Sequence, residues 1–196
     1  MDDDIVASRK KRERVVELHR WADKLRRELP LGEAIEVLDV RRLGTSDDDL
    51  YRVLTFELKN FLIDAGRQDQ ADRIIDEMIA RLPDDVRFPI GKASLYLYDI
   101  KDPRKALDAI NSALVRARRT GFFLREALGV KARILLELEL GHQLSQTLEE
   151  IMSVEMMPGI PDVGRERDFV DRAPAGLIDE DVLARYDVFC PRPAPK

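Results

Sequence analysis

The chain has 196 residues and a formal net charge of −5, with 44% hydrophobic and 36% charged residues. This composition predicts a soluble, helix-rich domain, and the mixture of both charge signs argues against disorder throughout. The acidic balance argues against nucleic acid as the main partner, and the single cysteine, Cys190, excludes an internal disulfide.

Neither a secretory signal nor a membrane span is recognisable in the sequence. The N-terminus changes from acidic to basic without an apolar core, and the most apolar patch, 134–140, is short and charged. We therefore expect a cytoplasmic protein with no membrane partner.

Two helices are predicted in the first 44 residues. Apolar residues at alternating steps of three and four predict a helix over 9–29, and a shorter helix follows over 32–42. The opposite face of the first helix is basic: Arg9, Lys10, Lys11, Arg12, Arg14, Arg20, Lys24, Arg26 and Arg27. This face is interpreted as a solvated helix surface partly paired with Glu13, Glu17 and Asp23; the alternative is a docking face for an acidic partner or nucleic acid.

Three helical hairpins are predicted next, over 47–82, 86–119 and 122–155. Ser46 is the expected N-cap of the first, and Gly66 separates its two helices. In the second, Asp102 followed by Pro103 is a helix start signal. In the third, Gly141 is the expected break between helices.

The segment 158–196 is rich in proline but keeps many large apolar side chains. We expect it to pack back on the preceding helices, because disordered tails are generally poor in such residues. Short helical pieces are predicted over 166–172 and 180–186, and only 191–196 is expected to be loose.

Two stretches repeat the same apolar pattern 35 residues apart. The pairs are Leu58 with Ala93, Leu62 with Leu97, Ala71 with Ala106, Ile75 with Ile110, Met78 with Ala113, and Ile79 with Leu114. A helix pair repeated at such a period is typical of stacked helical repeats.

This pattern resembles the tetratricopeptide repeat (TPR), a 34-residue helix–turn–helix, most closely over residues 52–118. Gly66 matches the turn, Ala71 the small crossing position, Ile75 and Met78 the core of helix B, and Pro83 the end of the unit.

The resemblance implies an all-α fold, an α-α superhelix of helical hairpins with the C-terminal segment packed back on it. Its expected parts are a repeat domain over 1–157, made of a cap (9–44), two repeats (47–83 and 86–119) and a divergent repeat (122–155), and an extension over 158–196. In the divergent unit, Leu128-Gly129 and Gly141 both match the pattern only if about five residues are inserted. That unit therefore has either a long first helix or a cap-like role.

In this family the first helices of the hairpins line a concave groove. The resemblance places these residues there: Val53, Phe56, Glu57, Asn60, Asp64, Phe88, Lys92, Leu95 and Asp99. Some members grip a C-terminal carboxylate with lysines and asparagines. Asn60 matches that pattern, but Phe56 and Lys92 replace a required lysine and asparagine, so carboxylate binding is not predicted. The alternative for Phe56 and Leu95 is burial in the core.

No metal-ligand spacing, phosphate loop or nucleophile motif occurs in the sequence. We expect no enzyme, no metal and no cofactor. The predicted function is a bacterial adaptor that binds a peptide or helix of one partner protein in the groove. The alternative is an immunity or antitoxin-type protein that neutralises a toxin by direct binding.

Overall fold

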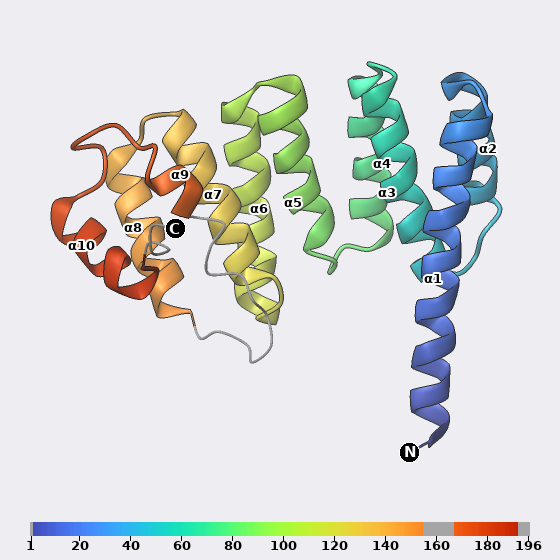
Figure 1. Cartoon of the computed structure of the whole chain (residues 1–196), viewed down its shortest axis with the longest axis horizontal. Coiled ribbons are helices and arrows are strands. Elements are labelled where there is room, and N and C mark those ends of the chain that lie inside the picture. Colours follow the sequence, from blue (N-terminus) through green and yellow to red (C-terminus); the bar gives the residue numbers. More distant parts are fainter. Residues whose placement is uncertain (1, 155–166, 192–196) are drawn as a thin grey trace, which may run out of the picture. The chain divides into compact units, whose positions relative to one another are not determined.

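The computed structural model describes the backbone of residues 2–154 and 167–191, and the side chains of 12–154 and 167–191. The chain divides into two compact units, 1–83 and 84–196. The first unit contains α1 (Asp2–Glu28), α2 (Leu31–Leu43), α3 (Asp48–Asp64) and α4 (Gln68–Arg81). The second contains α5 (Arg87–Ser94), the π-helix η1 (Leu95–Ile100), α6 (Pro103–Thr120), α7 (Leu124–Glu137), α8 (Gly141–Ser153), α9 (Arg167–Val170) and α10 (Glu180–Phe189) (Figure 1).

The predicted all-α architecture is confirmed, since these elements are helices packed in consecutive order and the described residues contain no strand. Gly66 adopts a positive φ between α3 and α4, where the sequence predicts the break between two helices, and Gly121 adopts one directly after α6. Asp102 caps α6 through a hydrogen bond from Lys105 N, with Pro103 at the first helical position. The first helix begins at Asp2, well before the predicted residue 9.

The 35-residue repeat corresponds to the core positions of the hairpins. Every residue of the six pairs is buried except Ile79, which is half-buried. Three alanines of the repeat have no exposed surface: Ala71 in α4, Ala93 in α5 and Ala106 in α6. Such small side chains let helix axes approach closely, so the repeat is set by packing.

Asp47, and not Ser46, is the N-cap of α3. Its carboxylate accepts hydrogen bonds from the backbone N–H groups of Asp49 at 2.9 Å and Leu50 at 3.1 Å. A carboxylate at this position both satisfies two unpaired donors and faces the positive end of the helix dipole, which explains the shift of the cap by one residue.

Gly141 is the first residue of α8, so the prediction that it forms the break between helices was wrong. The turn is Leu138–Leu140, where Glu139 takes the positive φ. A Cβ on Gly141 would lie 2.2 Å from the backbone oxygen of Leu177. Glycine is required here because the C-terminal segment passes directly over it. With 14 residues, α7 is no longer than the 87–100 helical segment, so the third unit has no extended first helix.

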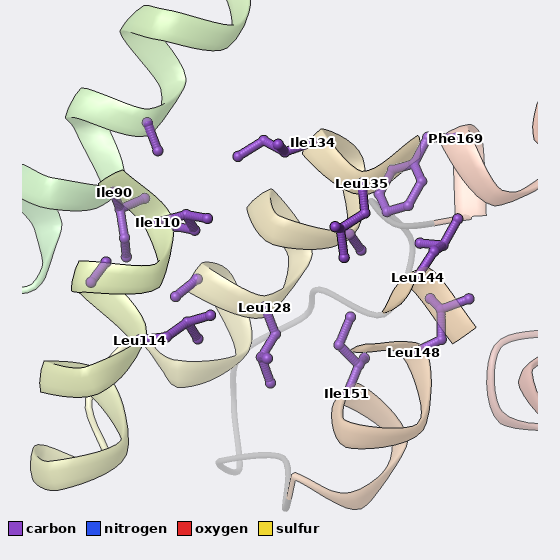
Figure 2. Packing of buried hydrophobic residues seen from close by; sticks show 14 of the residues in the cluster. Ile90, Ile110, Leu114, Leu128, Ile134, Leu135, Leu144, Leu148, Ile151 and Phe169 are labelled. Carbon is purple, nitrogen blue, oxygen red and sulfur yellow. The ribbon is translucent and has the colours of Figure 1, made fainter. Parts of the chain in front are cut away.

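The described part of the C-terminal segment packs against the last hairpin. Figure 2 shows Phe169 pointing toward Leu135 of α7 and Leu144 of α8. The backbone N–H of Asp179 donates to Ser145 Oγ at 2.9 Å. Residues 167–191 therefore cover the core at this end of the second unit. The predicted boundary at 157/158 lies outside the described residues, as does the predicted loose end 191–196 except for its first residue.

Arg167 holds the two ends of this segment together. Its guanidinium is buried and lies 2.6 Å from Asp171 and 2.5 Å from Asp187, and it donates to the carbonyl oxygen of Cys190. The hydrogen bond to Asp171, together with that to Asp187, raises the pKa of Arg167 above its ordinary value. The guanidinium therefore stays charged at neutral pH, as arginine ordinarily does.

Replacing Gly141 by alanine should displace the C-terminal segment, because the new methyl group would overlap the Leu177 carbonyl. We expect faster amide exchange at Asp179 and faster proteolysis between α9 and α10. Gly32→Ala is the matched control, since nothing lies within 4 Å of its added Cβ. Equal protection of Asp179 in Gly141→Ala and the unchanged protein would contradict this packing.

Asp47 should make part of the stability depend on pH. The N–H of Leu50, then that of Asp49 and the Arg14 guanidinium, lower the pKa of Asp47 below 3.8, its ordinary value. Because the folded pKa is depressed, the stabilisation is present above that ordinary value and is lost as pH falls through the folded pKa.

Asp47→Ala should lower the free energy of unfolding by about 1 kcal/mol at neutral pH through loss of the cap. Asp47→Asn keeps a capping oxygen but does not titrate, so it should lose much less stability at neutral pH. The free energy of unfolding of the original protein and of Asp47→Asn is measured by urea unfolding at several pH values. The difference between the two should shrink as the pH is lowered. A difference that stays constant from neutral to acidic pH would exclude this role.

Candidate functional site

The five predicted groove residues of the first unit lie on one face of α3. Their spacing of three and four places them in a single stripe, opposite the buried Leu54, Leu58 and Leu62. The stripe consists of Val53, Phe56, Glu57, Asn60 and Asp64. Folding thus brings the five residues that the resemblance assigned to the groove onto one face of a single helix.

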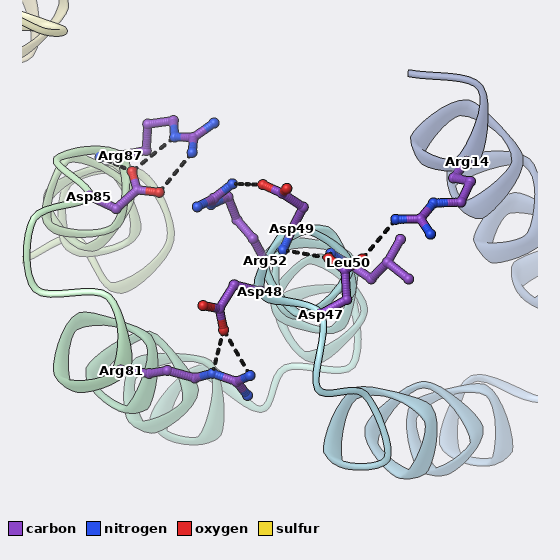
Figure 3. Close-up of polar contacts among 9 residues, drawn as sticks. All are labelled: Arg14, Asp47, Asp48, Asp49, Leu50, Arg52, Arg81, Asp85 and Arg87. Atoms are coloured by element: carbon purple, nitrogen blue, oxygen red, sulfur yellow. Dashed lines mark hydrogen bonds and ion pairs between the residues drawn. The ribbon is translucent and has the colours of Figure 1, made fainter. Parts of the chain in front are cut away.

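Helix α1 runs parallel to α3 along one edge of this stripe. Arg14 lies 2.7 Å from Asp47, His19 Nδ1 lies 2.5 Å from Glu57 Oε1, and Arg26 lies 3.0 Å from Asp64. The three contacts advance in the same direction along both helices, which fixes their relative register. Figure 3 shows the first of them at the N-terminus of α3.

These contacts change the interpretation of Glu57 and Asp64. Both carboxylates already have partners on α1, and the Glu57 side chain is only 16% exposed. They join two neighbouring helices and form a fixed polar border of the stripe. No sequence pattern indicated this pairing, because His19, the partner of Glu57, lies 38 residues away in the chain.

The basic face of α1 is partly neutralised by the same contacts. Arg14 and Arg26 pair with α3, and Lys24 lies 3.7 Å from Glu28 within its own helix. The sequence predicted partners within the first helix and did not indicate α3, whose acidic side chains lie directly opposite α1. The side chains of the predicted basic residues 9–11 lie outside the described part of the chain.

The remaining stripe residues form a small surface of mixed chemistry. Val53 and Phe56 are half-buried, and Asn60 is exposed. The ammonium of Lys59 lies 5.7 Å from the centre of the Phe56 ring, within cation–π range. An apolar ring beside an amide provides one hydrophobic contact and a paired donor and acceptor.

The four predicted residues of the second unit do not share one environment. Phe88 and Leu95 are 2% and 1% exposed, so their side chains offer no surface to a partner in this structure. Lys92 is half-buried and Asp99 is exposed. The sequence left open whether Leu95 lines the groove or is buried in the core, and in the structure it is buried.

Sequence reasoning missed the π-helix Leu95–Ile100, which contains Asp99. The wider turn changes which side chains face outward, and it leaves Tyr98 exposed beside Asp99. The segment ends at Lys101, which has a left-handed φ of 63° although it is not glycine. Only the absence of a glycine after this helix could have indicated an irregular end.

The described side chains include no group of three histidine, cysteine, aspartate or glutamate residues close enough to hold a metal ion. A search of the described helices also finds none that is long and apolar enough to cross a membrane.

No protein-family model matches the sequence, and no curated protein matches it. Two solved structures are similar: a Podosopora anserina putative kinesin light chain with nearly identical TPR-like repeats, and a variant of that same protein. Their TM-scores are 0.56 and 0.57 at 11% identity, covering 90% of this chain and 94% of theirs. The chain therefore has the TPR-like helical-repeat fold.

Proposed function

We propose that this protein is a non-enzymatic adaptor that binds a peptide or helix of one partner protein on the exposed stripe of α3. The observation that carries the proposal is the position of Phe56 and Asn60, one turn apart on one face of the first helix of a TPR-like hairpin. In such folds, that face is where an extended or helical ligand is bound.

The chemistry of the stripe suits a short protein segment. The half-buried Phe56 ring can cover an apolar side chain of the ligand, and the Asn60 amide can both donate to and accept from its backbone. The His19–Glu57 and Arg26–Asp64 pairs border the stripe and hold α1 in place. A surface fixed before binding loses less entropy when the ligand arrives.

In the second unit, Lys92 and Asp99 can supply polar contacts to the same class of ligand, but Phe88 and Leu95 cannot without rearrangement. The neutraliser alternative rests on net charge alone, and no contact among the described residues adds to it.

The proposal predicts that Phe56→Ala combined with Asn60→Ala weakens partner binding by at least about tenfold, because both central contacts are lost. The partner is first captured from the source cells and its binding is then measured by calorimetry. The thermal unfolding midpoint should change little, since neither side chain belongs to the buried core.

Phe122→Ala with Asn111→Ala is the matched control, because it removes the same two side-chain types from exposed positions on the second unit. This control should bind normally. If the α3 variant binds as tightly as the control, the stripe is not the binding surface.

A further inference from the structure

The guanidinium of Arg133 on α7 lies close to aromatic rings from two other elements of the second unit. Its central carbon is 6.0 Å from the centre of the Tyr98 ring on η1 and 5.9 Å from the centre of the Phe169 ring on α9. Both distances are within cation–π range. Phe169 is itself buried, so at least one of the two rings is fixed in the core. The position of this guanidinium is therefore set by its neighbours.

The same guanidinium has no hydrogen bond to any described residue. Its Nε is buried without a hydrogen-bond partner, and Oε1 of Glu137 lies 3.5 Å from it. Glu137 is four residues away on the same helix and its side chain is 51% exposed, so this ion pair contributes little. Buried polar groups are normally hydrogen-bonded. Arg133 therefore has donors that the described part of the chain does not use.

A ligand can reach this position from solvent. The Arg133 side chain is 27% exposed, and Tyr98 is 46% exposed beside it. Tyr98 also belongs to the π-helix Leu95–Ile100, an irregularity that is frequent at functional sites. Burial, exposure and backbone geometry thus coincide at one pair of side chains.

We propose that Arg133 and Tyr98 form a binding site for the carboxylate of an acidic side chain on a protein partner. The planar fork of a guanidinium can donate two parallel hydrogen bonds to a carboxylate. The Tyr98 ring can cover the methylene groups of the bound aspartate or glutamate. Because the neighbouring rings already hold the guanidinium, it loses less freedom when the ligand arrives.

The charges around Arg133 favour a carboxylate over a phosphate group. The site offers one guanidinium, and the Glu137 carboxylate stands beside it. A ligand with a second negative charge would be repelled by Glu137, whereas a carboxylate carries only one.

This site belongs to the second unit and shares no residue with the α3 stripe. It can therefore be tested without the partner that the stripe is proposed to bind. Loss of one proposal leaves the other standing.

The test uses the full chain and N-acetyl-glutamate amide, a small probe with one side-chain carboxylate. At constant ionic strength, the probe should shift the NMR signals of the Arg133 Nε–H group and the Tyr98 ring in a saturable way. N-acetyl-glutamine amide has the same size but no charge, so it should cause shifts at least about fivefold smaller. Equal shifts with both probes, or no shift at either residue, would overturn the proposal.

Arg133→Lys keeps a positive charge but cannot form two parallel hydrogen bonds to a carboxylate. It should weaken binding of the glutamate probe at least about fivefold, measured from the Tyr98 ring signals. Arg104→Gln is the matched control, because Arg104 is an exposed arginine on α6 outside the site. Circular dichroism shows whether both variants stay folded. A folded Arg133→Lys protein that binds the probe as tightly as the control contradicts the proposed role of the fork.

Inorganic phosphate, titrated in the same way, tests the choice of ligand. It should shift the Arg133 and Tyr98 signals less than the glutamate probe does, because Glu137 repels its second charge. Tighter binding of phosphate would show that the site does not select an acidic side chain.

Discussion

Close helix packing through alanine is the constraint on which the structure depends. Among the described residues, nine alanines have no exposed surface, including Ala22 and Ala34 in the first unit and Ala113 and Ala132 in the second. Axes that approach this closely leave no space for larger side chains, so the hairpins interdigitate in one register. Most ion pairs between helices lie at exposed positions and contribute little energy each. Close packing at the alanines limits how two helices can be aligned along their length, and the ion pairs favour one of those alignments. Arg14 and Arg26 act in this way between α1 and α3.

The helices and their order were predictable because their signals are local. The break at Gly66 and the helix start at Asp102–Pro103 each depend on only a few neighbouring residues, and the structure confirms both. The role of Gly141 could not be predicted in the same way. A side chain at this position would overlap the backbone carbonyl of Leu177, which lies 36 positions later in the chain. The π-helix was equally hidden, since nothing in its six residues distinguishes it from an α-helical turn.

The candidate site rests on both local and distant features of the chain. The resemblance assigned Phe56 and Asn60 to the groove, and their spacing within one helix places them on a common face, whereas the pairing of Glu57 and Asp64 depends on where α1 lies. A polar residue on a predicted groove face has two uses, to bind a ligand or to hold the neighbouring helix. Sequence spacing cannot separate them, because both require the same side chain at the same position. An apolar residue assigned to the groove can likewise either contact a ligand or belong to the core, and only its burial in the structure distinguishes the two. Phe88 and Leu95 are buried and therefore belong to the core.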